Sequence, residues 1–162
     1  SGREIVSEPK LFIGAADLLI DPPPDWQPRA LIQNVEAGAQ FVQTQPCFDF
    51  EVVRRYMARL VDNGFADRVF MMIGTGPLVS VRSAHWMRGN LYGVIIPDEI
   101  IDRMKQAGDS KAEGARICAE LIHKLSEIPG VAGAYLMAPD NLVGILGAVE
   151  LSGLKKGREA PA

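Results

Sequence analysis

Short runs of hydrophobic residues alternate along this chain with longer stretches in which hydrophobic side chains recur every three or four positions. Four of the runs are continuous enough for strands inside a sheet, and they begin near positions 11, 41, 69 and 131. The first run, residues 11–16, is typical of a strand buried on both faces. The stretches between the runs have the period of helices that bury one face. Because strands that alternate with helices form parallel sheets, the pattern predicts an α/β fold with about four parallel strands and flanking helices.

Residues that start or stop helices mark several of the predicted boundaries. Pro28 suits the first turn of the helix before the second strand, and Gly38 stops that helix. Asp49 is a plausible N-cap for the helix after the second strand, which ends at Gly64. Residues 110–113, Ser-Lys-Ala-Glu, have the spacing of a capping box and predict the start of the most regular helix of the chain.

The spacing of the predicted strands points to a particular kind of parallel sheet. The first three begin about 30 residues apart, close to the repeat of about 31 residues in a (β/α)8 barrel. The longer interval before the fourth strand holds two additional helical segments. Four units are half of a barrel, so we expect a partial (β/α)8 TIM-barrel-like domain over residues 11–152, with a flexible segment over 1–10 and a disordered tail over 153–162.

A half barrel leaves two strand edges and one apolar face without a cover. We therefore expect one of three arrangements. The other half is supplied from elsewhere, two copies of the chain associate, or the piece adopts an open sheet.

The composition limits the classes of partner. The net charge is −3 and there is no basic cluster, which argues against a nucleic-acid partner. No run of about 18 apolar residues is present, so we expect no membrane span. Cys47 and Cys118 lie far apart and have neither metal-ligand spacing nor the pattern of a disulfide framework. This favours a reduced, cytoplasmic chain without a metal site.

The second predicted strand carries amide side chains where it ends. Gln43, Thr44 and Gln45 come directly before Pro46, and ligands of α/β proteins bind at the carboxyl ends of parallel strands. The period of two places both Gln residues on one side and Thr44 on the other, where it packs on or bonds to a neighbouring strand. Gln45 offers donors and an acceptor to the edge of a heterocycle; the alternative is a buried Gln that satisfies loop backbone. For Gln43 the structural role is slightly favoured.

Three further features have both a functional and a structural interpretation. Cys47 has no histidine near it in sequence, which favours a small apolar loop residue over a nucleophile. Residues 74–76, Gly-Thr-Gly, lack the other residues of a phosphate-binding fingerprint and predict a strand-end turn. Trp26 and Trp86 can stack on a ligand ring or pack against the protein.

Six segments resemble, in their order, the C-terminal half of methylenetetrahydrofolate reductase. They are LFIGAAD, NVEAGAQFVQTQPCFD, IGTGPLVSV, IPDEIIDRM, EGARICAELI and IPGVAGAYLMA, which together cover about residues 11–150. The second is the most specific, because it combines a helix stop, a strand and a polar strand end. The resemblance implies a (β/α)8 barrel with FAD at the carboxyl ends of the strands. It also implies an oxidoreductase that uses NAD(P)H and FAD to reduce 5,10-methylenetetrahydrofolate to 5-methyltetrahydrofolate.

The resemblance also suggests roles for individual residues. It assigns Gln45 to the pterin of a tetrahydrofolate derivative, and Ala15 and Ala16 to the flavin. Asp17 stands where many members have an aromatic residue, and Asp25 lies close to the position of an acidic flavin contact; we include both as candidate cofactor contacts.

Other positions depart from the family pattern. Asn34 replaces a lysine near the flavin phosphates, and residues 137–139, Met-Ala-Pro, replace the bacterial Leu-Asn-Arg. The catalytic glutamate of the family lies on a strand outside this chain. We therefore assign no catalytic residue.

The leading hypothesis is a part of a methylenetetrahydrofolate-reductase-like flavoprotein that is inactive as this fragment alone. The alternatives are a non-catalytic folate- or pterin-binding module, a subunit that completes another chain's barrel, and a domain retained for assembly without a ligand. The expected partners are a tetrahydrofolate derivative, NAD(P)H, and either a missing N-terminal half or further copies in a homo-oligomer.

Overall fold

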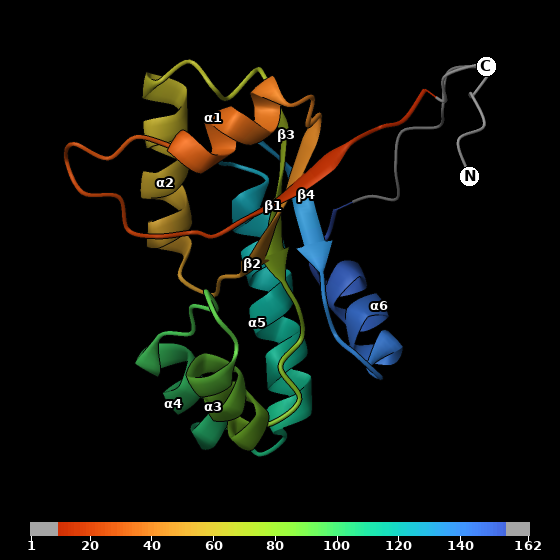
Figure 1. Ribbon diagram of the computed structural model, residues 1–162. Coiled ribbons are helices and arrows are strands. Elements are labelled where there is room, and N and C mark those ends of the chain that lie inside the picture. The colour runs from red at the N-terminus through yellow and green to blue at the C-terminus, as the bar shows by residue number, and fades with distance from the viewer. Residues whose placement is uncertain (1–9, 155–162) are drawn as a thin grey trace, which may run out of the picture.

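The structure is a computed structural model, and it describes residues 10–154. Its four strands form one parallel sheet in the order β1-β2-β3-β4 (Figure 1). The strands are β1 (Gly14–Asp17), β2 (Phe41–Pro46), β3 (Phe70–Thr75) and β4 (Val131–Leu136). The predicted α/β fold with four parallel strands is confirmed, and it is consistent with part of a TIM barrel. The predicted flexible segment and disordered tail fall almost entirely outside the described residues.

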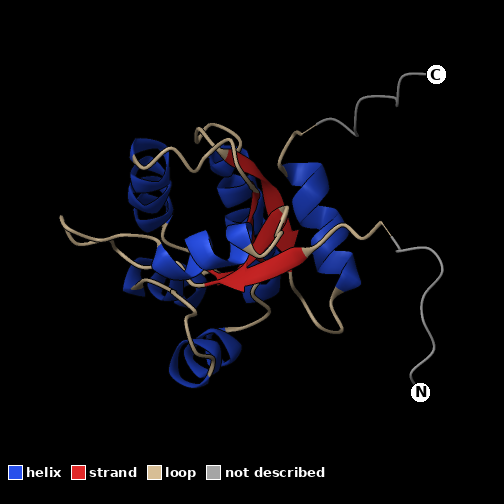
Figure 2. Ribbon diagram, turned by 45° about the horizontal axis from the view of Figure 1, so that its top comes forward, coloured by secondary structure: helices blue, strands red, loops and turns tan. Residues whose placement is uncertain are grey.

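Six helices accompany the sheet in the described part of the chain, and Figure 2 shows them grouped around the twisted strands. They are α1 (Arg29–Glu36), α2 (Phe50–Asp62), α3 (Val81–Asn90), α4 (Asp98–Gln106), α5 (Ser110–Leu125) and α6 (Leu142–Leu151). In Figure 1, α3 and α4 lie beyond the tips of the strand arrows, at the carboxyl end of the sheet. These two helices are the additional segments expected before the fourth strand.

The hydrophobic core lies between one face of the sheet and the helices. Val42 of β2 and Ile73 of β3 are fully buried in one cluster with Met57 of α2 and Leu125 of α5. Burial of such apolar side chains supplies most of the favourable free energy of folding. The side chains that alternate with these core residues point to the opposite face of the sheet.

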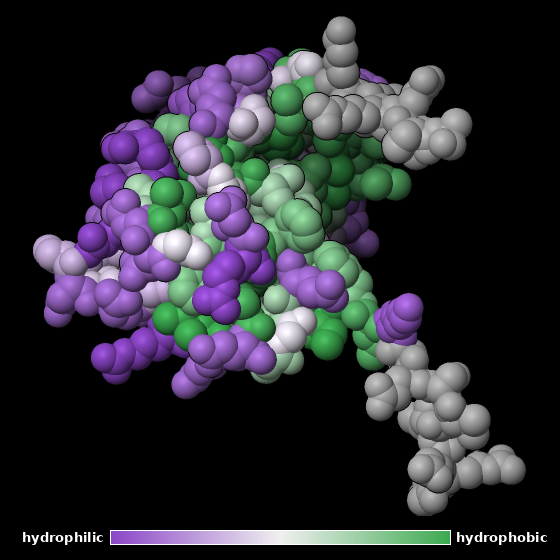
Figure 3. Space-filling view, turned by 90° about the horizontal axis from the view of Figure 1, so that it is seen from above, coloured by the Kyte–Doolittle hydropathy of each residue, from purple (hydrophilic) through white to green (hydrophobic). Residues whose placement is uncertain are grey.

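That opposite face, which we call the open face, is apolar and uncovered within the described residues. A shallow hollow on it is lined by Phe12, Phe41, Gln43, Phe70, Met72 and Ala132. Phe70 is 60% exposed, and Figure 3 shows hydrophobic residues gathered along a hollowed part of the surface. The sheet of the single chain is thus open on this face, and which of the three arrangements expected for a half barrel applies stays a prediction.

The first strand differs from its prediction. The run from residue 11 was expected to be buried on both faces, but β1 begins at Gly14, and Phe12 before it is 61% exposed. The Phe12 ring stacks on Phe41 with a centroid distance of 5.1 Å. The physical reason is that β1 is an edge strand with helices on one side only, so its other face has little to pack against.

The helix boundaries confirm one predicted cap and correct another. Asp49 caps α2, since its Oδ1 accepts the backbone N–H groups of Glu51 and Val52 at 3.0 and 3.1 Å. The capping box expected at 110–113 is wrong. Asp109 caps α5 instead, and the carboxylate of Glu113 is bound by two arginine side chains rather than by the start of its own helix.

Candidate functional site

A hollow of about 340 Å³ lies at the carboxyl ends of β2, β3 and β4, and we call it the strand-end hollow. Its lining residues come from β2 and from the segments that follow β3 and β4. They are Gln45, Pro46, Gly76, Pro77, Leu78, Val79, Ser83, Trp86, Met87, Leu91, Met137, Ala138, Pro139 and Asn141. The volume is at the lower end of the range for small-molecule sites, about 300 to 1,000 Å³.

Gln45 presents its side chain to the strand-end hollow. It is exposed, and within residues 10–154 its amide has no hydrogen-bond partner from the protein. The structure therefore does not have the alternative arrangement in which Gln45 is buried and satisfies loop backbone. An unpaired amide at the end of a parallel strand can donate to and accept from a ligand.

Thr44 occupies the other side of β2, as predicted. Its hydroxyl accepts the Gly74 backbone N–H at 2.8 Å and donates to the Gln45 carbonyl oxygen at 3.1 Å. These bonds span the point between Gln43 and Pro46 at which the register of β2 and β3 shifts. Thr44 thus fixes the backbone from which the Gln45 side chain projects.

The segment after α3 returns to the end of β2 and closes one side of the hollow. The Ile95 N–H donates to the Pro46 carbonyl oxygen at 3.0 Å, and the Phe48 N–H donates to the Ile95 carbonyl oxygen at 2.8 Å. An isolated parallel bridge joins Cys47 to Ile95 at the same place. The backbone bonds therefore hold α3, which carries Trp86, against the strand that carries Gln45.

Gln43 lies on the same face as Gln45, as the period of two predicts, but in a different hollow. Its side chain lines the open face among phenylalanines, whereas Gln45 lines the strand-end hollow. The structure therefore does not bring the two predicted substrate contacts into one pocket. A role for Gln43 in binding stays a prediction.

The four candidate cofactor contacts are scattered, and none of them lines the strand-end hollow. Ala16 is exposed and pairs with Gln43 in the sheet, while Ala15 packs on the core. Asp25 is exposed in the proline-rich loop. Asp17 turns toward α2, where its carboxylate accepts the Tyr56 hydroxyl. Their assignment to a cofactor stays a prediction.

The surroundings of Asp17 make stability depend on pH. Burial raises the pKa of Asp17, and this outweighs the hydrogen bonds from the Tyr56 hydroxyl and the Leu18 N–H, which lower it. The folded state therefore holds the Asp17 proton to a higher pH than the unfolded chain does. The contribution of Asp17 to the free energy of unfolding is therefore most favourable below its unfolded pKa of about 3.9. It is lost as the pH rises through the folded pKa.

We expect Asp17→Asn to remove this pH dependence, because the amide keeps an acceptor for Tyr56 and carries no charge. The parent chain loses this contribution as the pH rises from 4 to 7, and the variant does not. The urea midpoint of the variant minus that of the parent should therefore be larger at pH 7 than at pH 4. Asp25→Asn, an exposed carboxylate in the following loop, is the matched control and should show no such gain. If the midpoint of Asp17→Asn differs from that of the parent by the same amount at pH 4 and at pH 7, Asp17 is not the source of the pH dependence.

Cys47 is fully buried in the core beside the hollow. Burial raises the pKa of its thiol to about 12, and the thiol donates to the Asp49 carbonyl oxygen at 3.4 Å. A thiol in this environment stays protonated at neutral pH and is a poor nucleophile. The prediction of a small apolar residue is confirmed.

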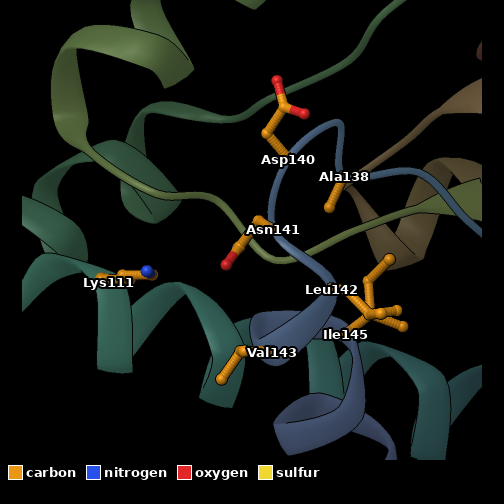
Figure 4. A pocket seen from close by; sticks show the side chains of 7 residues that line it. All are labelled: Lys111, Ala138, Asp140, Asn141, Leu142, Val143 and Ile145. Carbon is orange, nitrogen blue, oxygen red and sulfur yellow. The ribbon is translucent and has the colours of Figure 1, made fainter.

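A second hollow, of about 400 Å³, adjoins the first at the start of α6 and shares Ala138 and Asn141 with it. Figure 4 shows Lys111 of α5 and Asn141 extending toward one another there. Asn141 is the N-cap of α6, and its Oδ1 accepts the Gly144 N–H at 3.3 Å. Because the carboxylate of Asp140 lines the same hollow as the Lys111 ammonium, the lining carries charges of both signs.

Sequence reasoning did not single out several residues of the strand-end hollow. Met87, Leu91 and Asn141 line it, but each has a hydrophobic or helix-capping pattern that is ordinary in a core or at a helix end. The longer interval before the fourth strand was the one sequence signal, since an insertion near strand ends often builds a site.

Four parallel strands in sequential order, joined by helices and with a ligand-sized hollow at their carboxyl ends, form an α/β domain consistent with part of a TIM barrel. The family model for methylenetetrahydrofolate reductase matches residues 21–141. The chain belongs to the methylenetetrahydrofolate reductase family. No curated protein matches the chain at a significant level. The matched range includes Gln45 and Asp25 and does not include Ala15, Ala16 or Asp17.

The family is generally flavin-dependent and acts on a folate substrate. Within the described residues, no helix is long and apolar enough to cross a bilayer.

Proposed function

We propose that this chain forms part of a methylenetetrahydrofolate-reductase-like oxidoreductase and that Gln45 binds the pterin of a tetrahydrofolate derivative. The observation that carries the proposal is the exposed Gln45 amide, which has no protein partner among the described residues and lines a ligand-sized hollow. The family membership supplies the substrate class.

The chemistry of the hollow suits one edge of a pterin. The Gln45 side chain offers two N–H donors and a carbonyl acceptor, which match the neighbouring amide and amino groups of a pterin edge. The walls are largely apolar, so a ring that covers the Gln45 amide would shield these hydrogen bonds from water. The contribution of this chain is to bind and orient the substrate.

The described residues do not by themselves make a flavin site. Of the four candidate contacts only Ala16 lies on the open face, and the Asp17 carboxylate is bound to Tyr56. We therefore propose that FAD, and the NAD(P)H that would reduce it, act only where further residues complete the barrel. The exposed phenylalanines of the open face support such a completion, because a closed barrel buries its interior side chains.

A second candidate is a folate- or pterin-binding module without catalysis, or a subunit that completes another chain's barrel. The orientation of Asp17 toward α2 and the presence of Asn34 at the family's lysine position favour it. Titration with FAD of the chain joined to residues that complete the barrel separates the flavoprotein from the non-catalytic binding module, since only the flavoprotein should bind FAD.

Gln45→Ala tests the proposed function. Loss of the amide should weaken the binding of 5-methyltetrahydrofolate about 10-fold, because a hydrogen bond to a ligand contributes about 1 to 1.5 kcal/mol. Isothermal titration calorimetry on the full chain measures the change. Gln33→Ala, an exposed glutamine on α1, is the control and should bind as the parent does.

Two results would contradict the assignment of Gln45. One is a parent chain that does not bind the folate, and the other is a Gln45→Ala variant with unchanged affinity. Gln43→Ala adds a comparison between the two hollows, and we expect it to have the smaller effect.

A further inference from the structure

We propose that Trp86 stacks on the face of the same pterin ring whose edge Gln45 binds. This inference rests on the proposed function and assigns a second recognition element to its site. It combines an amide at the edge of the ring with an indole on its face.

The position of Trp86 supports this role. The residue lies on α3, is 57% exposed, and lines the strand-end hollow together with Gln45. Among the described residues that line this hollow, it is the one aromatic side chain. A large apolar ring left partly open at the wall of a cavity is available for a ligand.

The other tryptophan shows what a structural role looks like in this fold. Trp26 is partly buried and packs on Tyr56, with ring centroids 5.0 Å apart. Within the described residues no aromatic ring pairs with Trp86. Of the two interpretations that the sequence left open, packing therefore applies to Trp26, and stacking on a ligand applies to Trp86.

Hydrogen bonds at both ends of α3 fix the helix that carries Trp86. At the start of the helix, the Ser83 N–H donates to the Ser80 Oγ at 3.0 Å and the Ser80 N–H donates to the Ser83 Oγ at 3.1 Å. After the helix, the chain bonds to the end of β2 through Ile95. Because the helix is already in position, only the rotamer of the indole remains to be ordered when a ring binds to it.

The size of the hollow favours one ring system rather than a whole folate. About 340 Å³ accommodates a flat bicyclic ring, and the aminobenzoyl and glutamyl parts of a folate would extend from the open side of the hollow. Because Gln45 and Trp86 line the same small space, one ring can reach both of them there.

The test compares Trp86→Ala and Trp86→Phe with the parent chain, using 6-methyltetrahydropterin, the ring alone, as the probe. Stacking on an aromatic side chain predicts about 10-fold weaker binding for Trp86→Ala. Trp86→Phe keeps a ring and should stay within about threefold of the parent. Tyr92→Ala is the matched control, because Tyr92 is 85% exposed on the same insertion and does not line the hollow.

Tryptophan fluorescence gives an independent readout. The probe should quench the emission of the parent chain and leave Trp86→Phe, in which Trp26 remains, largely unchanged. Thermal melts of the variants should match that of the parent, since Trp86 lies outside the buried core.

The outcomes separate this inference from the proposed function. If the parent binds the pterin, Gln45→Ala weakens binding and Trp86→Ala does not, the stacking assignment is overturned and the proposed function stands. A second probe is p-aminobenzoylglutamate, the remainder of the folate. If Trp86→Ala weakens the binding of this probe and not that of the pterin, a different ring lies on Trp86 and the assignment is also overturned. If the parent binds neither 5-methyltetrahydrofolate nor the pterin, both fail.

Discussion

Gly114→Ala is expected to lower the free energy of unfolding by at least about 3 kcal/mol, because a methyl group at this position collides with backbone. A Cβ on Gly114 would overlap the carbonyl oxygen of Leu78, in the loop that follows β3. Neither partner can rotate away, since one lies inside α5 and the other is a main-chain atom. The urea midpoint followed by circular dichroism measures the loss.

The same substitution should reach the candidate site. Leu78 lines the strand-end hollow, so a displaced loop changes the wall that faces Gln45. Gly147→Ala is the control within a helix, because a Cβ there meets no atom within 4 Å. It should raise stability by up to about 1 kcal/mol through helix propensity. A Gly114→Ala variant as stable as the parent would show that α5 and this loop do not approach so closely.

Arg103→Met is expected to cost about 2 kcal/mol at neutral pH, because it leaves a buried carboxylate with one partner fewer. The Arg103 Nε donates to Glu113 at 2.5 Å, and both terminal nitrogens donate to Glu120 at 2.6 Å. Arg116 also bonds to Glu113. The methionine keeps most of the length of the side chain, so the loss reports the charge and the hydrogen bonds.

The pH dependence of this loss has a definite sign. Burial alone would raise the pKa of Glu113, but the hydrogen bonds from Arg116 and Arg103 lower it below its usual range. The stabilisation is therefore present above the unfolded pKa of about 4.3 and is lost as the pH falls through the folded pKa. The cost of Arg103→Met should shrink at acid pH.

Arg54→Met is the control for the ion pair. Arg54 bonds to Glu51 on the exposed side of α2, and such solvent-screened surface pairs contribute little to stability. Two results would contradict this prediction. One is an equal loss of unfolding free energy for both variants, and the other is a loss for Arg103→Met that does not change with pH.

Hydrophobic periodicity was enough to predict the type and order of the elements. It also placed Thr44 and Gln45 on opposite sides of β2, and the Thr44 bond to Gly74 confirms this. Asp49 was recognised as a helix cap because the capping bonds join residues two and three apart in sequence. These features could be predicted because their causes are local.

The errors arose where two local signals competed or where burial depended on distant elements. Asp109 and Ser110 are both good caps, and in the structure Asp109 caps α5 while Glu113 bonds to Arg103 and Arg116 instead of to the helix start. Phe12 belongs to an apolar run, but its exposure depends on whether a helix covers that side of β1. Periodicity carries no information about such a cover.

The sequence by itself determined that four parallel strands alternate with helices and that an amide stands at the end of the second strand. Only the tertiary structure decided which side chains meet that amide. Trp86 and Met137 reach the same hollow as Gln45 because the sheet order places the ends of β2, β3 and β4 together and because the segment around Ile95 bonds back to β2. Contacts between residues so far apart depend on the packing of the whole sheet, which no local pattern encodes.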